Sequence, residues 1–178
     1  MAPSFEFRLA DDVEAADFIR TTFSGETWEH YRSLQIGAAK ADFWRLLTIY
    51  RHGGVYMDMD ATLIWPLAFI LGSDKEVFLR HGKNFTNYFF AASPENEHVA
   101  MLIEAVNRNI AEGTIRSVFD LTGPTVLVRT FEGVTVNAES YNTVCREGVI
   151  TNEFFQYRDR PTEKWGKKQA AVPIIKPN

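Results

Sequence analysis

Two aspartates separated by one residue, Asp58 and Asp60, are the residues of this sequence best suited to chemistry. They close the alternating run 55–60, and a strand would place Tyr56, Asp58 and Asp60 on one face. Two carboxylates on one strand face would lie roughly 6–7 Å apart and would repel each other unless a cation compensates them. A hard divalent ion, with oxygen ligands, waters and phosphates around it, is the natural partner. The pattern therefore predicts a divalent-metal site at Asp58 and Asp60.

A second polar pair, Asp42 and Arg45, lies in the segment before this run. Residues 38–52 have helical periodicity, and Gly53–Gly54 is expected to end the helix. Asp42 falls on the apolar side of the helix, and a buried carboxylate must be paired, hydrogen-bonded or bound. Arg45 is within reach, three residues further on. Two interpretations stay open, an ordinary intrahelical ion pair and a polar pair directed into a site.

The whole stretch 38–66 resembles the signature of the DXD-motif glycosyltransferase superfamily. This superfamily includes bacterial capsular-polysaccharide sugar transferases, the yeast mannosyltransferase that starts outer-chain growth and the clostridial glucosylating toxins. The matching residues are Ala39, Asp42, Arg45, Tyr50, Gly53, Gly54, Tyr56, Asp58, Asp60, Pro66 and Leu67. The resemblance implies a GT-A fold, a UDP- or GDP-sugar donor, a carbohydrate acceptor, Mn²⁺ or Mg²⁺, and transfer with retention at the anomeric carbon.

The resemblance also implies roles for these residues. Asp60 would coordinate the metal, and Asp58 would hold ribose or sugar hydroxyls and reach the metal through water. Asp42 and Arg45 would grip the donor sugar, and Tyr56 would belong to the same donor site. No residue of the sequence is assigned as a catalytic nucleophile.

Two later segments resemble family elements as well. Asn87, in the expected strand 84–92, matches an asparagine that meets the donor sugar, and a turn residue capping the strand is the other interpretation. Thr122-Gly123-Pro124 matches a loop that lies near the active site in relatives.

The sequence departs from the family at both ends. Relatives begin with an Ile-Pro-Lys-Ile-Ile-His strand, for which we find no counterpart, and they carry a late histidine, whereas the last histidine here is His98. Trp165 with its neighbouring lysines could cover the diphosphate, or the tail from about residue 158 could be loose. A truncated, catalytically weak nucleotide-sugar-binding module is therefore the alternative function. If the family's first strand is missing, the edge of the neighbouring strand stays unpaired. Such an exposed sheet edge would favour a homodimer.

Residues 58–63 also resemble the first motif of haloacid-dehalogenase-type phosphatases. That chemistry needs a downstream acidic pair for magnesium, and no Asp-Asp or Gly-Asp cluster follows Asp60. The phosphatase is the less favoured interpretation.

Composition sets the remaining limits. With 178 residues, 46% of them hydrophobic, and a net charge of −4, the chain is expected to form one globular domain that does not bind nucleic acid. No apolar run suggests a membrane span and no leader is evident, so the predicted location is cytoplasmic.

The expected fold is α/β and GT-A-like, with a mostly parallel sheet flanked by helices and the site at the carboxyl end of strand 55–59. Ser93–Pro94 is expected to open a helix that Gly113 ends. Further strands are expected near the N-terminus, over 1–7, and over 149–157.

Overall fold

A mixed four-stranded sheet forms the centre of the computed structural model, which describes residues 4–23, 25–149, 157–162 and 164–177. The strand order is β1 (Gly54–Met57), β4 (Asn84–Ala92), β3 (Glu76–His81) and β5 (Ala138–Ser140). β4 pairs antiparallel with β1 and β3, and only β5 pairs parallel, with β3. The predicted mostly parallel sheet is therefore wrong. Two residues, Gly82 and Lys83, separate β3 from β4, and such a link allows a hairpin but not the long crossover of a parallel pair.

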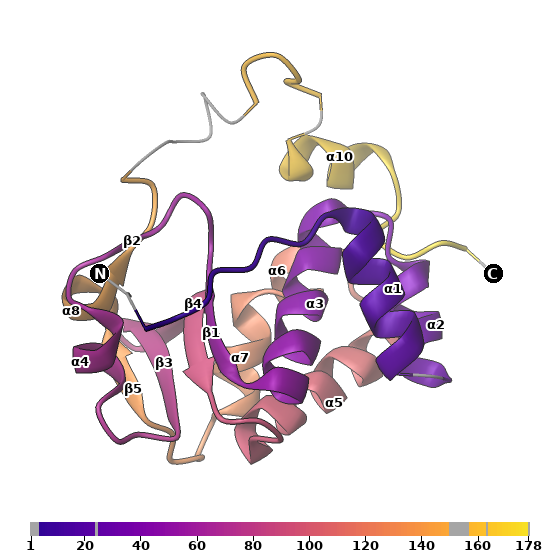
Figure 1. Ribbon diagram of the computed structural model, residues 1–178. Helices are drawn as coiled ribbons and strands as arrows, with labels where there is room; N and C mark the ends of the chain where they lie inside the picture. Colours follow the sequence, from indigo (N-terminus) through magenta and orange to yellow (C-terminus); the bar gives the residue numbers. More distant parts are fainter. Residues whose placement is uncertain (1–3, 24, 150–156, 163, 178) are drawn as a thin grey trace.

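The direction of the strands still gives the sheet one functional edge. β1 and β3 both run opposite to β4, and β5 runs with β3, so three carboxyl ends meet at the edge where β4 begins. Figure 1 shows this edge at the top of the sheet, below the loop that leads from β1 to β2 (Thr62–Leu63). Loops that follow strand carboxyl ends in an α/β sheet are the usual place for a ligand.

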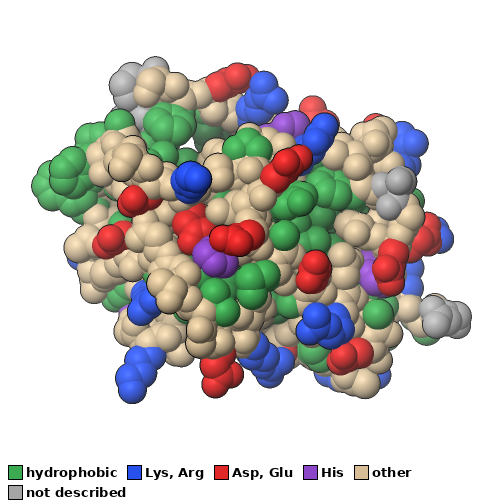
Figure 2. Space-filling view, turned by 90° about the horizontal axis from the view of Figure 1, so that it is seen from below, with side chains coloured by type: hydrophobic (Ala, Val, Ile, Leu, Met, Phe, Trp, Pro, Cys, Tyr) green, Lys and Arg blue, Asp and Glu red, His purple; other side chains and the backbone are tan. Residues whose placement is uncertain are grey.

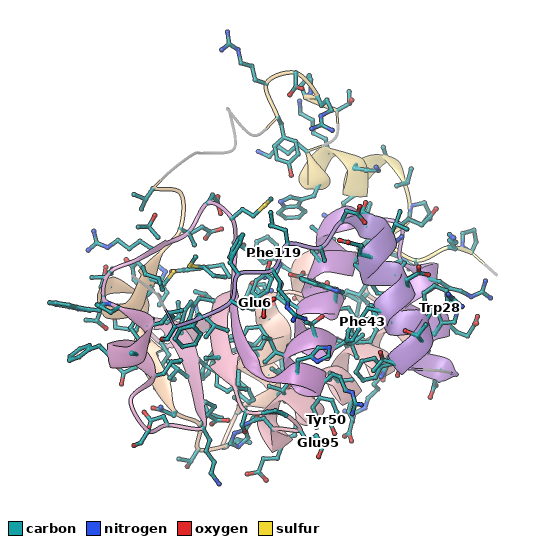
Figure 3. All side chains as sticks on the ribbon, viewed as in Figure 1. Glu6, Trp28, Phe43, Tyr50, Glu95 and Phe119 are labelled. Carbon is teal, nitrogen blue, oxygen red and sulfur yellow. The ribbon has the colours of Figure 1, made fainter. Side chains whose placement is uncertain are left out.

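Helices cover one face of the sheet. α3 (Gly37–His52) packs with α1 (Asp12–Thr22), α2 (Glu26–Ser33), α5 (Glu97–Glu112), α6 (Val118–Leu121) and α7 (Pro124–Thr130), as Figure 1 shows. Phe78 and Phe90 of the sheet join this core, and Phe43 of α3 lies among the helices, fully buried (Figure 3). The α/β prediction is confirmed.

A smaller layer covers the opposite face. It consists of α4 (Leu67–Leu71), α8 (Tyr141–Val144) and the short ladder of β2 with β6 (Cys145–Arg146). Val77, Leu79 and Phe89 face this layer, whereas their neighbours Phe78 and Phe90 face the helices. The alternation follows from the two-residue period of a strand.

The junction between α3 and α5 differs from the prediction at one end. The cap of α5 is Asn96, whose side chain accepts a hydrogen bond from the Val99 amide at 3.0 Å, so the helix does not begin at Ser93–Pro94. Pro94 instead packs against the end of α3, where a Cβ on Gly53 would lie 2.5 Å from the Pro94 ring. Gly113 ends α5 in the left-handed conformation, as predicted.

The last part of the C-terminal segment, over residues 165–174, contacts the rest of the fold. The Trp165 ring at the start of α10 (Trp165–Ala171) contacts Phe119 edge-on. The Val118 amide donates to the Gln169 side chain at 2.7 Å, and the Gln35 amide donates to the Ile174 carbonyl at 2.7 Å.

Two expected strands remain to be placed. Residues 4–10 form no strand, and residues 150–156 of the expected strand 149–157 lie outside the described residues. Among the helices described, none has the length and apolar character needed to cross a bilayer. Charged side chains of both signs are interspersed on the face shown in Figure 2.

Candidate active site

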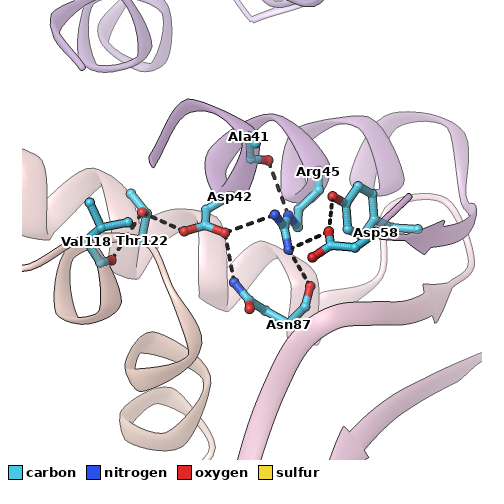
Figure 4. A network of polar contacts seen from close by, with 8 residues as sticks. Ala41, Asp42, Arg45, Asp58, Asn87, Val118 and Thr122 are labelled. Atoms are coloured by element: carbon cyan, nitrogen blue, oxygen red, sulfur yellow. Dashed lines mark hydrogen bonds and ion pairs between the residues drawn. The ribbon is translucent and has the colours of Figure 1, made fainter. Parts of the chain in front are cut away.

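A buried ion pair between Asp42 and Arg45 forms the base of the site. Both residues lie on the inner face of α3, with only 7% and 6% of their surfaces exposed. Arg45 Nη2 lies 3.1 Å from Asp42 Oδ1, which also accepts a hydrogen bond from Asn87 Nδ2 at 2.9 Å. Thr122 Oγ1 donates to Asp42 Oδ2 at 3.0 Å (Figure 4). The intrahelical pair therefore exists, but it is one part of a network that spans three segments.

Burial and hydrogen bonding act against each other at Asp42. Removal from water raises the pKa of the Asp42 carboxyl above its ordinary value, while Arg45, Thr122 and Asn87 favour the charged form. A carboxylate in this position is tolerated because both of its oxygens have partners.

Arg45 extends the network toward the first aspartate of the DXD motif. Its Nη1 donates to the Asn87 carbonyl at 2.6 Å and lies 3.5 Å from Asp58 Oδ1. The guanidinium carbon lies 4.3 Å from the centre of the Tyr56 ring, and the Tyr56 hydroxyl donates to the same oxygen of Asp58. One arginine thus links the two carboxylates and orients Asp58 from one side.

A bulge in β4 brings Asn87 to this network. Phe78 of β3 faces Phe90, but the next residue, Leu79, faces Thr86, so three β4 residues (87–89) have no counterpart on β3. The bulge turns both the side chain and the carbonyl of Asn87 toward α3, and the Tyr88 carbonyl accepts a hydrogen bond from the Asp58 amide at 2.8 Å. Bulges often redirect side chains beside active sites, and this one does so for Asn87.

The two aspartates of the motif do not share a strand face. β1 ends at Met57, and the following residues turn, with the Ala61 amide donating to the Asp58 carbonyl at 3.0 Å. The predicted strand geometry for Asp58 and Asp60 is therefore wrong. The turn brings them together with a third residue, Glu147, such that one carboxylate oxygen of each lies within 4.8 Å of the others. We call Asp58, Asp60 and Glu147 the carboxylate trio.

Glu147 reaches the trio through the β2–β6 ladder. Thr62 pairs with Arg146 and Leu63 with Cys145, so the residue after β6 lies beside the turn that holds Asp58 and Asp60. Sequence reasoning missed Glu147, because an acidic residue before a glycine is too common to signal a ligand. Only the pairing of β2 with β6 places Glu147 beside the two aspartates, and the periodicity of the sequence does not reveal that pairing.

The chemistry of the trio fits a hard divalent cation. Burial raises the pKa of Asp58 and of Glu147, and the neighbouring carboxylates raise them further, while Arg45 opposes the shift. Carboxylate oxygens are the ligands that Mg²⁺ and Mn²⁺ prefer, and the three oxygens lie close enough together to reach one ion.

Comparisons with known proteins bear on the family and the fold of the chain. Residues 5–78 match the family described as "Glycosyltransferase sugar-binding region containing DXD motif". An uncharacterized glycosyltransferase, L373, from Acanthamoeba polyphaga mimivirus is 35% identical over 85 residues, which is 47% of this chain and 34% of that protein. The solved structure of PaToxG glycosyltransferase shares the fold, with a TM-score of 0.54 and 18% identity, over 90% of this chain and 55% of that one. The chain thus spans about a third of the curated relative and about half of the solved structure.

Proposed function

We propose that this chain, which belongs to the DXD-motif glycosyltransferase superfamily through residues 5–78, transfers a hexose from a UDP- or GDP-sugar to a carbohydrate hydroxyl in a metal-dependent reaction. The observation that carries the proposal is the carboxylate trio at the carboxyl edge of the sheet, joined through Asp58 to the buried Asp42–Arg45 pair. The family match includes Asp58 and Asp60, which favours glycosyl transfer over the phosphatase interpretation of the same residues.

Each member of the trio has a distinct part in this proposal. Asp60 and Glu147 would hold Mn²⁺ or Mg²⁺, and such an ion, when bound, offsets the charge of a diphosphate leaving group. Asp58 has Oδ1 engaged by Tyr56 and Arg45, so Oδ2 is the oxygen left for ribose, a sugar hydroxyl or metal-bound water.

The buried pair would form one wall of the donor-sugar site. Asp42 and Arg45 use most of their polar atoms on each other, on Asn87 and on Thr122. We therefore assign them to hold Asn87 and Asp58 in place as well as to contact the sugar through what remains exposed. Rigid support of this kind lowers the entropy lost when the donor is bound.

The proposed reaction retains the anomeric configuration. A bond forms between the acceptor hydroxyl oxygen and the anomeric carbon, and the bond from that carbon to the diphosphate oxygen breaks. The electron pair leaves with the diphosphate, which also takes the hydroxyl proton. The anomeric proton coupling of the product, followed by NMR from the start of the reaction, distinguishes retention from inversion.

Asp60→Asn tests the metal assignment with little change in shape. We expect calorimetry to show that Mn²⁺-dependent binding of UDP or GDP is lost, together with metal-dependent donor hydrolysis. Asp17→Asn, an exposed carboxylate of α1, is the matched control and should change neither. Unaltered affinity in Asp60→Asn would refute the assignment. Binding without turnover in the unmodified chain would support the binding-module alternative.

Self-association belongs to the same proposal. Phe7 and Leu9 are 78% and 66% exposed in the N-terminal segment, and a homodimer would cover such apolar side chains. Sedimentation at increasing concentration, with a Phe7→Ser/Leu9→Ser variant for comparison, tests this.

A further inference from the structure

A small pocket lies beside the carboxylate trio and shares Glu147 with it. Its volume is about 270 Å³. His81, at the end of β3, and Tyr141, the first residue of α8 after β5, contribute side chains from the carboxyl edge of the sheet. Arg146 and Glu147 line the pocket from the β6 side. The pocket therefore opens where the reacting groups of the proposed transferase would meet.

Aromatic rings form one wall of the pocket. The His81 and Tyr141 rings meet at 64°, with their centroids 4.5 Å apart. Ser140 caps α8 through a 3.3 Å hydrogen bond from the Asn142 amide, which holds the helix start that carries Tyr141. Tyr88 is anchored by its hydroxyl, which donates to the Cys145 carbonyl at 2.8 Å. Fixed aromatic rings offer apolar faces with polar edges, and a pyranose ring packs its C–H face on such surfaces.

Polar groups form the rest of the lining. Arg146 supplies hydrogen-bond donors and Glu147 supplies acceptors. The Glu147 carboxylate would repel an anionic ligand, and the Arg146 guanidinium would repel a cationic one. A neutral ligand with several hydroxyl groups satisfies donors and acceptors together, whereas a hydrocarbon would leave them unpaired.

We propose that this pocket is the acceptor subsite and that it takes one neutral pyranose ring, an inference that rests on the proposed transferase function. The volume is just below the range of about 300–1,000 Å³ found for drug-sized ligands, and it suits a single sugar ring. Since Glu147 belongs to both the pocket and the trio, the acceptor hydroxyl would lie next to the diphosphate end of the donor.

Saturation-transfer NMR with methyl α-glucoside, methyl α-mannoside and methyl α-galactoside, in the presence of Mn²⁺ and UDP or GDP, tests the subsite. We expect at least one hexoside to bind the unmodified chain. Tyr141→Ala should weaken it about tenfold or more, and Tyr141→Phe, which keeps the ring, should restore it. Phe69→Ala, which removes an exposed ring from α4, is the control and should bind the hexoside as the unmodified chain does.

The same samples separate this inference from the proposed function. If the unmodified chain binds Mn²⁺ and a nucleotide but no hexoside, or if Tyr141→Ala binds the hexoside normally, the acceptor subsite is refuted. Transfer to a peptide or protein in place of any sugar would also refute it. If no nucleotide binds with Mn²⁺, the proposed function fails, whatever the hexosides do.

Discussion

Replacing Thr122 by Val tests whether the Asp42 network stabilises the fold as its geometry indicates. Thr122 is 1% exposed, and its hydroxyl donates to the buried Asp42 carboxylate at 3.0 Å. Valine keeps nearly the same shape but leaves one carboxylate oxygen without that donor. A hydrogen bond to a charged group contributes roughly 1.5–3 kcal/mol, so we expect the free energy of unfolding to fall by about 2 kcal/mol.

Urea denaturation gives the measurement. With an m-value of about 2 kcal/mol/M, that loss lowers the urea midpoint by about 1 M without altering the slope. Because the lost donor favoured the charged carboxylate, the pKa of Asp42 should rise further in the variant.

Thr48 of α3 provides the matched control. Its hydroxyl is also shielded from water, but it has no hydrogen-bond partner among the described residues. Thr48→Val therefore removes an unpaired polar atom and should leave stability within about 0.5 kcal/mol of the original, or raise it. Equal losses in Thr122→Val and Thr48→Val would refute the reasoning, because they would show that the bond to Asp42 contributes nothing beyond the shape of the side chain.

Three further changes follow from the same structure. Arg45→Met leaves Asp42 buried without its cation, so urea denaturation should show that the free energy of unfolding falls by about 3–5 kcal/mol. An exposed helical pair contributes only a few tenths of a kcal/mol. A loss below about 1 kcal/mol would contradict a buried pair. Gly53→Ala should lower the melting temperature more than Gly133→Ala, because both glycines have positive φ but only the Cβ at 53 meets Pro94; equal shifts would show that the contact relaxes freely. Glu147→Gln should weaken Mn²⁺ binding about tenfold or more, measured by calorimetry, and should leave the urea midpoint near its original value. An unchanged Mn²⁺ affinity would show that Glu147 is not a metal ligand.

Local patterns predicted the residues that lie on regular elements. Helical periodicity placed Asp42 on the buried face of α3, and the double glycine marked the end of that helix, as the structure has them. The Thr-Gly-Pro loop was expected near the site, and the Thr122 bond to Asp42 agrees with that. These features depend on residues within a few positions of one another, or on a stated family resemblance.

The errors concern contacts between distant segments and local backbone irregularities. The strand period was extended two residues too far, because nothing in the alternation of residues 55–60 signals that β1 stops at Met57. The bulge at 87–89 depends on how β4 pairs with β3 on one side and β1 on the other. Glu147 depends on a ladder of two residue pairs. The parallel sheet was inferred from the fold family, whereas the short link between β3 and β4 allows only an antiparallel pairing of these two strands.

The β2–β6 ladder also has a consequence for the order of folding. It joins residues 62–63 to residues 145–146, and because it closes a long loop we expect it to form after the local hairpin of β3 and β4. During synthesis, a chain that has not yet extended beyond residue 146 carries Asp58 and Asp60 without their third carboxylate. The full affinity for a cation would therefore arise only when β6, followed by Glu147, has paired with β2. The ion would then bind the folded domain and not the nascent chain.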